Sequence, residues 1–213
     1  MSESFQTIPH FYLSVDVNAA ALVAYRQKVL SEYEQTYGIH LTYTDILLKA
    51  LAVTLKDHPL LNASYHSEGE IKIYEAINLG VAISDGQGLV VGVIHDSDRL
   101  SLVQIAQTRL ALTQKARDHK LAPQDILGGT FTLTNLGMYG IDNFSPIINP
   151  DQSAILAVGA IAERPTGENG QVVLRPMMKA TLAVDHRVAD GVSGALFFRD
   201  FVKVLESPEA LGN

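Results

Sequence analysis

Apolar side chains recur at helical spacing along several stretches of the chain. Gly38 follows the first stretch as a stop signal, and Ser101 with Gln104 forms the Ser-x-x-Gln pattern of a capping box. The second stretch is apolar on nearly all sides, so we expect that helix to be deeply buried. We predict helices at residues 19–37, 44–57, 101–118 and 191–205, with a short helix beginning at Pro123.

Shorter apolar runs, bounded by turn residues, predict strands. The predicted strands cover residues 8–17, 63–66, 71–74, 77–83, 89–95, 130–134, 153–161, 172–174 and 178–184. Hairpin turns are expected at residues 68–69, 85–88 and 167–170, each of which contains glycine. The strands and helices do not follow one another in repeating βαβ units. Their order therefore favours a single α+β domain over residues 1–213, with a mixed sheet flanked by helices.

The amino-acid composition argues against several classes of function. The net charge is −7, which argues against a general nucleic-acid binder because phosphate binding relies on clustered lysine and arginine. The chain has no cysteine, so any thiol chemistry must use a thiol that the substrate brings. No apolar run approaches the roughly 20 residues of a membrane span. The N-terminus lacks the pattern of a secretory signal, and we expect a cytoplasmic protein.

The strongest chemical candidate is His186, which follows the apolar run of residues 180–184 and precedes Asp190 and Gly191. Three interpretations are open. His186 is satisfied by the backbone while Asp190 caps the last helix; or the two form part of a metal site, for which no third ligand is visible; or His186 is a general base and Asp190 holds its turn. Arg187 adds a positive charge, expected in an ion pair at the surface or at a subunit contact.

The second candidate is Thr134, at the end of a strand in which threonine alternates with apolar residues. Strand threonine usually reflects β-propensity alone, but Thr134 lies where the strand breaks and could donate its hydroxyl to an oxyanion. Gly137 and Gly140 follow, and they would let the backbone approach a ligand closely.

Four stretches in register resemble one protein family. They are residues 62–64, 129–140, 147–159 and 185–191. The chain resembles the catalytic core domain of the dihydrolipoamide acyltransferases of 2-oxo acid dehydrogenase complexes. The resemblance implies a chloramphenicol-acetyltransferase-like fold and homotrimers, and it leaves open whether the trimers form a cubic core, a dodecahedral core or nothing larger. It also implies His186 as the catalytic base, Asp190 as the carboxylate that holds the active-site loop, and Thr134 of a neighbouring subunit as the donor to the tetrahedral intermediate.

The resemblance further implies the substrates. An acyl group would move between dihydrolipoamide, carried on a separate lipoyl domain, and coenzyme A, without a metal. We expect coenzyme A to contact residues at the site wall, which are Asn135, Gly137, Met138, Phe144 and Ser145.

Two departures leave alternatives open. The chain begins about where the first helix of the family would end, so we expect this helix to be either truncated or lacking, and we expect neither a lipoyl domain nor a subunit-binding domain in residues 1–213. A rival hypothesis is therefore a structural core with weak activity. A second rival is acetylation of a small-molecule hydroxyl. The sequence does not distinguish acetyl, succinyl and branched-chain acyl groups.

Overall fold

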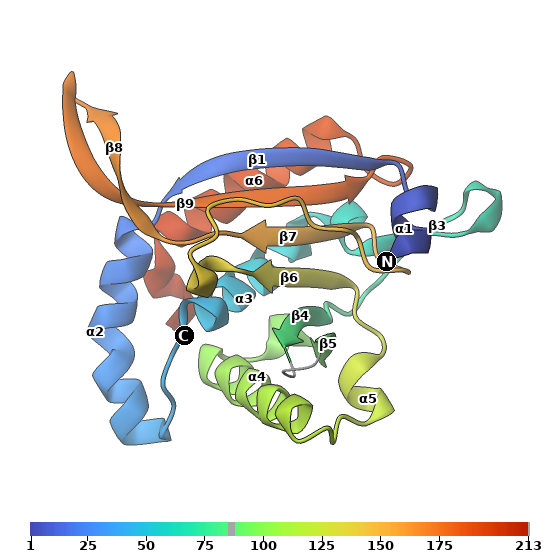
Figure 1. The fold of residues 1–213 in the computed structure, drawn as a ribbon, viewed down its shortest axis with the longest axis horizontal. Coiled ribbons are helices and arrows are strands. Elements are labelled where there is room, and N and C mark those ends of the chain that lie inside the picture. The colour runs from blue at the N-terminus through green and yellow to red at the C-terminus, as the bar shows by residue number, and fades with distance from the viewer. Residues whose placement is uncertain (85–87, 213) are drawn as a thin grey trace.

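The computed structural model describes residues 1–84 and 88–212, and its centre is a sheet covered by helices (Figure 1). The strands are β1 (His10–Asn18), β2 (Ala63–Tyr65), β3 (Ile71–Ile73), β4 (Leu79–Ser84), β5 (Leu89–Ile94), β6 (Phe131–Asn135), β7 (Ala154–Val158), β8 (Ala162–Glu168) and β9 (Gln171–Asp185). The helices are α1 (Ser2–Thr7), α2 (Ala20–Tyr37), α3 (Tyr43–Thr54), α4 (Leu102–Arg117), α5 (Pro123–Ile126) and α6 (Gly191–Glu206).

The main sheet is mixed, as predicted. Among the described residues it has seven strands, in the order β1-β9-β7-β6-β4-β5, with β8 pairing to the first half of β9. Strand β6 is parallel to β4 and to β7, whereas β9 is antiparallel to β7 and to β1. Because β7 is parallel to β6 but antiparallel to β9, the carboxyl ends of β6 and β9 lie at opposite ends of the strands in the sheet. Strands β2 and β3 form a separate two-stranded hairpin.

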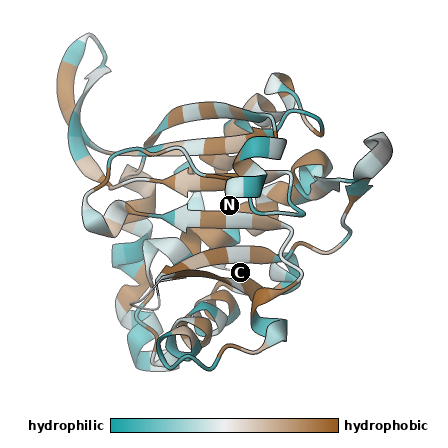
Figure 2. Cartoon of the chain, turned by 45° about the vertical axis from the view of Figure 1, so that its right-hand side comes forward, coloured by the Kyte–Doolittle hydropathy of each residue, from teal (hydrophilic) through white to brown (hydrophobic). Residues whose placement is uncertain are grey.

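The two faces of the sheet are covered differently. Figure 1 shows α3 and α6 behind the sheet and the chain between β6 and β7 in front of it. Phe131 and Leu133 of β6 belong to the large hydrophobic core shared with the helices, while Ile148, from the crossing chain, belongs to a smaller cluster on the other face. Figure 2 shows the corresponding alternation of hydrophobic and hydrophilic residues along the strands. Thr134 therefore lies on the front face of the sheet, because side chains alternate along a strand.

Several local signals predicted the structure correctly. Gly38 ends α2 in the left-handed conformation with φ of 65°. Ser101 and Gln104 form the predicted capping box of α4. The second helix is deeply buried, and it begins at Tyr43 with Thr42 as its cap, slightly before the predicted start. The short helix at Pro123 and the closing helix are both present.

Other predictions were wrong. Residues 172–174 and 178–184 are not two strands but parts of the single β9, and β8 was not predicted. The β8–β9 arm projects from the body, so neither face of its outer part is buried and the apolar alternation is lost (Figure 1). Its turn at Asn169 and Gly170 was predicted, and both residues have positive φ, as in a type I′ hairpin. Helix α1 was also missed. Residues 85–87 of another predicted turn lie outside the described residues.

Candidate active site

His186 lies in a loop that connects β9 to α6. Its backbone N–H donates to the carbonyl of Pro9 at 3.1 Å, so the loop is attached to the start of β1. The imidazole meets the ring of Phe11 edge-on, with 5.3 Å between the ring centroids. The side chain is exposed, and its ring nitrogens make no hydrogen bond to any described residue. The ring is therefore held in place by packing while both nitrogens are available to a substrate.

The loop is stabilised by an ion pair of Arg187, which the sequence predicted, with a partner that it did not identify. Asp185 is 1% exposed, and its carboxylate accepts hydrogen bonds from the backbone N–H of Arg187 at 3.0 Å and from the guanidinium Nη2 at 2.7 Å. The guanidinium also lies over the ring of Tyr65, 4.1 Å from its centroid. Hydrogen bonding to Asp185 raises the pKa of Arg187. The sequence had assigned no role to Asp185; a buried strand ending in Asp-x-Arg was the available signal.

Asp190 caps α6. Its carboxylate accepts from the backbone N–H and the hydroxyl of Ser193, both at 2.8 Å. These bonds lower the pKa of Asp190, the bond from the backbone N–H most strongly. The capping interpretation and the interpretation that Asp190 holds the turn of His186 therefore describe the same contacts, because this cap fixes the point at which the loop enters the helix.

Thr134 differs from the other threonines on its face of β6. Thr132 donates its hydroxyl hydrogen to Gln152 at 2.8 Å and accepts from Asn149 at 2.8 Å, and Thr130 donates to Asn62 at 2.6 Å. The half-exposed Thr134 hydroxyl has no hydrogen-bond partner among the described residues. A free hydroxyl at a strand end is available to a bound ligand, which β-propensity alone does not require.

Thr134 and His186 are far apart within one protomer. Strand register places Thr134 opposite Ala157, and Ala157 opposite Thr181, so the two threonines share one row across three strands. His186 is five residues beyond that row. With about 3.3 Å per residue and about 4.8 Å per strand, the two residues are separated by roughly 17 Å along the sheet and about 10 Å across it. They cannot act on the same atom unless they come from different protomers.

A cavity of about 420 Å³ lies beside the end of β6. Asn135, Gly137 and Met138 line it, together with Thr44 and Arg109. The Asn135 amide donates to the Thr44 hydroxyl at 3.1 Å, and its oxygen accepts from the Gly137 N–H at 2.8 Å. Three of the five residues predicted to contact coenzyme A therefore share one cavity. Phe144 and Ser145 do not line it and belong to the chain that crosses the front of the sheet.

The cavity wall is fixed by a buried ion pair. Asp45 is fully buried, and Arg109 bonds to it through Nε and Nη2. Asp45 also accepts from the backbone N–H of Thr42 at 2.8 Å, which completes the capping box of α3. The pair thus joins α4 to the start of α3 at the edge of the cavity.

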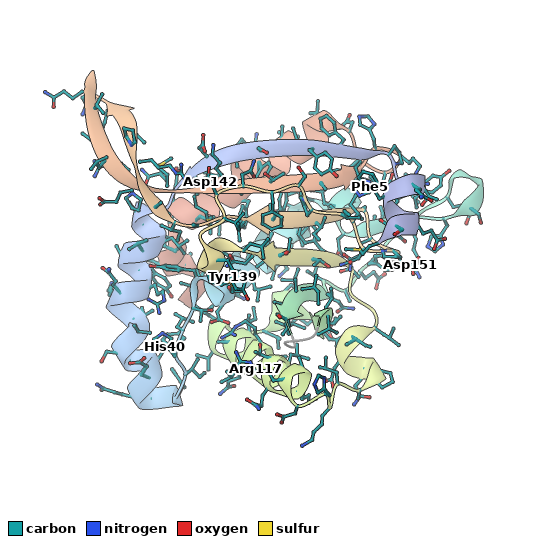
Figure 3. All side chains as sticks on the ribbon, viewed as in Figure 1. Phe5, His40, Arg117, Tyr139, Asp142 and Asp151 are labelled. Atoms are coloured by element: carbon teal, nitrogen blue, oxygen red, sulfur yellow. The ribbon has the colours of Figure 1, made fainter. Side chains whose placement is uncertain are left out.

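A larger cavity, of about 820 Å³, lies at the other end of β6. Its lining includes Thr130, Asn149 and Asp151, and the hairpin contributes His66 and Tyr74. Figure 3 shows Tyr139, which follows the carboxyl end of β6, and Asp151, which precedes β7, toward opposite ends of the sheet. Tyr139 lines a smaller cavity that also contains Asn135 and Arg109. Cavities are therefore present at both ends of the strand that carries Thr134.

The described residues show neither a metal-binding cluster nor a helix that could span a membrane. Residues 1–84 and 88–212 contain no group of three or more histidine, cysteine, aspartate or glutamate side chains arranged to hold a metal ion. None of the described helices is long and apolar enough to cross a membrane.

Comparison with known proteins identifies the family. The family model for the 2-oxoacid dehydrogenases acyltransferase (catalytic domain) matches residues 1–212. The acetyltransferase component of the Rickettsia conorii pyruvate dehydrogenase complex is 39% identical over 97% of this chain and 50% of its own length. The succinyltransferase component of the Haemophilus influenzae 2-oxoglutarate dehydrogenase complex is 38% identical over 92% of this chain and 48% of its own length.

Solved structures agree. A probable dihydrolipoamide acetyltransferase from Listeria monocytogenes superposes with a TM-score of 0.94 at 36% identity, covering 97% of this chain and 88% of its own. The Azotobacter vinelandii dihydrolipoamide acetyltransferase has the same TM-score at 31% identity, covering 99% and 86%. A chloramphenicol acetyltransferase at 15% identity has a TM-score of 0.56 over 95% and 94%, which shows the predicted fold alone. The chain spans about half the length of the Rickettsia conorii and Haemophilus influenzae relatives. On this evidence the chain belongs to the acyltransferase catalytic domain family of the 2-oxoacid dehydrogenases.

Proposed function

We propose that this chain transfers an acyl group between dihydrolipoamide and coenzyme A, as the core of a 2-oxo acid dehydrogenase complex. The observation that carries the proposal is that the chain has an accessible imidazole, His186, and a free hydroxyl, Thr134. Their separation along the sequence equals that of two residues in a characterised relative. A serine, a histidine and an asparagine have been examined for their roles in the catalytic mechanism of the Azotobacter vinelandii enzyme. There the serine lies 52 positions before the histidine and the asparagine four positions after it, as do Thr134 and Asp190 relative to His186.

The proposed mechanism uses general-base catalysis. An unbonded ring nitrogen of His186 removes the proton from the thiol of coenzyme A, and the thiolate attacks the carbonyl carbon of the acyl-dihydrolipoamide thioester. The Thr134 hydroxyl of a neighbouring protomer donates to the oxyanion that forms. The intermediate then expels the dihydrolipoamide thiolate, which takes the proton back from the imidazolium. One thioester bond forms as another breaks, so the protein mainly needs to position and desolvate the two thiols.

The two cavities suggest where the substrates bind. We assign coenzyme A to the 420 Å³ cavity, which Asn135, Gly137 and Met138 line. The acyl-lipoyl group of a separate lipoyl domain would then approach from the 820 Å³ cavity at the opposite end of β6. In this arrangement the coenzyme A thiol and the acyl thioester would approach from opposite ends of β6, the strand that carries Thr134. The predicted contacts from Phe144 and Ser145 stay predictions.

The separation of Thr134 and His186 requires an assembly. A homotrimer, in which each protomer supplies the imidazole to one neighbour and the hydroxyl to the other, satisfies the geometry with one repeated contact. A structure that superposes on this chain with a TM-score of 0.94 is the cubic core of a pyruvate dehydrogenase multienzyme complex. We propose a trimer as the unit of activity, with larger cores built from trimers. The cytoplasmic location stays a prediction.

The test is the activity of His186→Ala with free dihydrolipoamide and acetyl-, succinyl- or isobutyryl-coenzyme A. Loss of a general base lowers turnover by about 10²–10⁴-fold. A matched control is His40→Ala, because His40 is an exposed histidine paired with Glu34 on the opposite part of the molecule from the His186 loop (Figure 3). Near-normal turnover in His186→Ala would reject the assignment of the base. A wild-type trimer that binds no coenzyme A in a titration would instead favour the structural-core alternative.

A further inference from the structure

His10 has contacts that the proposed mechanism does not use. It is the first residue of β1 and lies opposite Asp185 in the register of β1 with β9, so it is directly beside the loop of His186. Its ring lies between two aromatic side chains. The centroid of Phe5 is 6.1 Å away and that of Tyr12 is 5.9 Å away. Figure 3 shows Phe5 at the same end of the sheet as Asp151.

Both ring nitrogens of His10 are hydrogen-bonded, and the partners determine which one carries the proton. Nδ1 is 2.8 Å from the carbonyl oxygen of Ile8, which can only accept. Nε2 is 3.0 Å from the backbone N–H of Ile148, which can only donate. The ring must therefore be neutral with its proton on Nδ1. No other natural side chain presents a donor and an acceptor on a rigid ring at these two positions.

The first of these bonds shapes the segment that holds the His186 loop. Ile8 accepts from both the ring and the backbone N–H of His10, the latter at 2.9 Å, so the chain turns tightly through Pro9. The carbonyl of Pro9 in turn accepts from the backbone N–H of His186 at 3.1 Å. The His10 ring thus fixes the carbonyl on which the catalytic loop rests.

The second bond reaches the other half of the site. Ile148 is fully buried in the chain that crosses the front of the sheet, and the next residue, Asn149, donates to the hydroxyl of Thr132 at 2.8 Å. Thr132 is two residues before Thr134 on the same face of β6. A single imidazole is therefore connected through short hydrogen-bonded paths to both the His186 loop and the strand of Thr134.

We propose that His10 is a positioning residue that holds both half-sites of a protomer in register, an inference that rests on the proposed acyltransferase function. In a trimer, the two half-sites of one protomer belong to two different active sites. His10 then sets the geometry of two neighbouring sites at once. It touches neither reacting thiol, and it acts through Pro9 and Ile148.

The test compares His10→Phe with His10→Gln. Phenylalanine keeps a ring between Phe5 and Tyr12 but makes neither hydrogen bond, whereas glutamine offers an amide oxygen to Ile148 and an amide hydrogen for donation. Because a misplacement of about 1 Å can cost about 100-fold in rate, we expect kcat of His10→Phe to fall by about 10- to 100-fold. We expect KM for both substrates to stay within about threefold and His10→Gln to recover most of kcat, since substrate contacts are unchanged.

The controls separate positioning from folding and from function. Sedimentation and circular dichroism measure the folded trimer, and His40→Phe is the matched histidine substitution. A kcat within twofold of wild type in His10→Phe, a loss that only follows the folded fraction, or equal losses in both variants would each overturn the proposal. So would ¹⁵N NMR of the wild type showing the proton of His10 on Nε2. Inactive wild-type protein would instead overturn the proposed function, while the NMR result still decides the two ring bonds.

Discussion

Subunit complementation follows from the separation of His186 and Thr134. If each active site takes its imidazole from one protomer and its hydroxyl from the next, two inactive variants should restore activity when they share a trimer. The perturbation is to mix His186→Ala protomers, which keep the threonine, with Thr134→Ala protomers, which keep the histidine. Within one protomer the two groups are separated by roughly 17 Å along the sheet and about 10 Å across it, so no protomer can restore a site by itself.

The magnitude follows from the symmetry of the trimer. Removing an oxyanion donor costs about 10²–10³ in kcat, so Thr134→Ala alone should keep at most about 1% of wild-type activity. In random trimers from equal amounts of both variants, a site is intact only under two conditions. The protomer that supplies its imidazole must be the Thr134→Ala variant, and the protomer that supplies its hydroxyl must be the His186→Ala variant. That occurs at about one site in four, because each of the two positions is filled independently with even odds. The mixture should therefore show about 25% of wild-type turnover per protomer, far above either parent.

The assay measures acyl transfer after both variants are unfolded together and refolded. Wild-type protein taken through the same cycle gives the reference, and each variant refolded alone gives the baseline. A further control mixes His186→Ala with the double variant His186→Ala/Thr134→Ala, which contains no intact histidine and should stay at the baseline. A mixture that stays at baseline although sedimentation and mass spectrometry show mixed trimers would refute the shared site.

Three further predictions concern the cavity wall, the crossing chain and a buried tyrosine. Arg109→Leu leaves the buried Asp45 carboxylate without its guanidinium, and it should lower the free energy of unfolding by about 3–5 kcal/mol in denaturant titrations; an unchanged midpoint would contradict the pair's importance. Gly159→Ala makes a Cβ clash with the carbonyl oxygen of Asp142, so the crossing chain must move, and circular dichroism should show a thermal transition at a lower temperature than in wild type. Burial raises the pKa of Tyr33 to about 12 from the ordinary 10.0. The contribution of the neutral phenol to the free energy of unfolding is therefore complete below pH 10 and is lost as the pH rises toward 12. An ultraviolet titration of Tyr33→Phe should lack the tyrosine ionisation near pH 12 that wild type shows.

The sequence predicted the elements that local chemistry determines. Gly38 ends a helix because a left-handed residue is needed there, and the Ser101 box satisfies free N–H groups at a helix start; neither depends on distant contacts. The β8–β9 arm could not be read in this way. Its strand identity comes from pairing across the turn at Asn169, since its outer residues are exposed and polar or mixed.

The candidate site was predicted in part for the same reason. His186 and Thr134 both lie near strand ends, where an apolar run stops, and such breaks are visible in sequence. Asp185 was not identified as the partner of Arg187, although the Asp-x-Arg pattern was available. The contact of His10 with Ile148 was not visible, because it joins residues 138 positions apart. The absence of Phe144 from the lining of the 420 Å³ cavity likewise depends on the path of the crossing chain, which has no periodic pattern.

The direction of the strands explains why the proposed active site needs a second protomer. Thr134 and His186 both lie near the carboxyl end of a strand, and in a fully parallel sheet such ends share one edge, so both groups could serve a single site in one chain. Here β9 runs opposite to β6, which sends the two ends to opposite edges. No loop rearrangement short of unfolding β9 can bring its end to Thr134, because β9 is paired on both sides along its inner half. The mixed sheet therefore separates the two groups of the proposed site within one protomer, and the proposed function requires a repeated contact between protomers to bring them together.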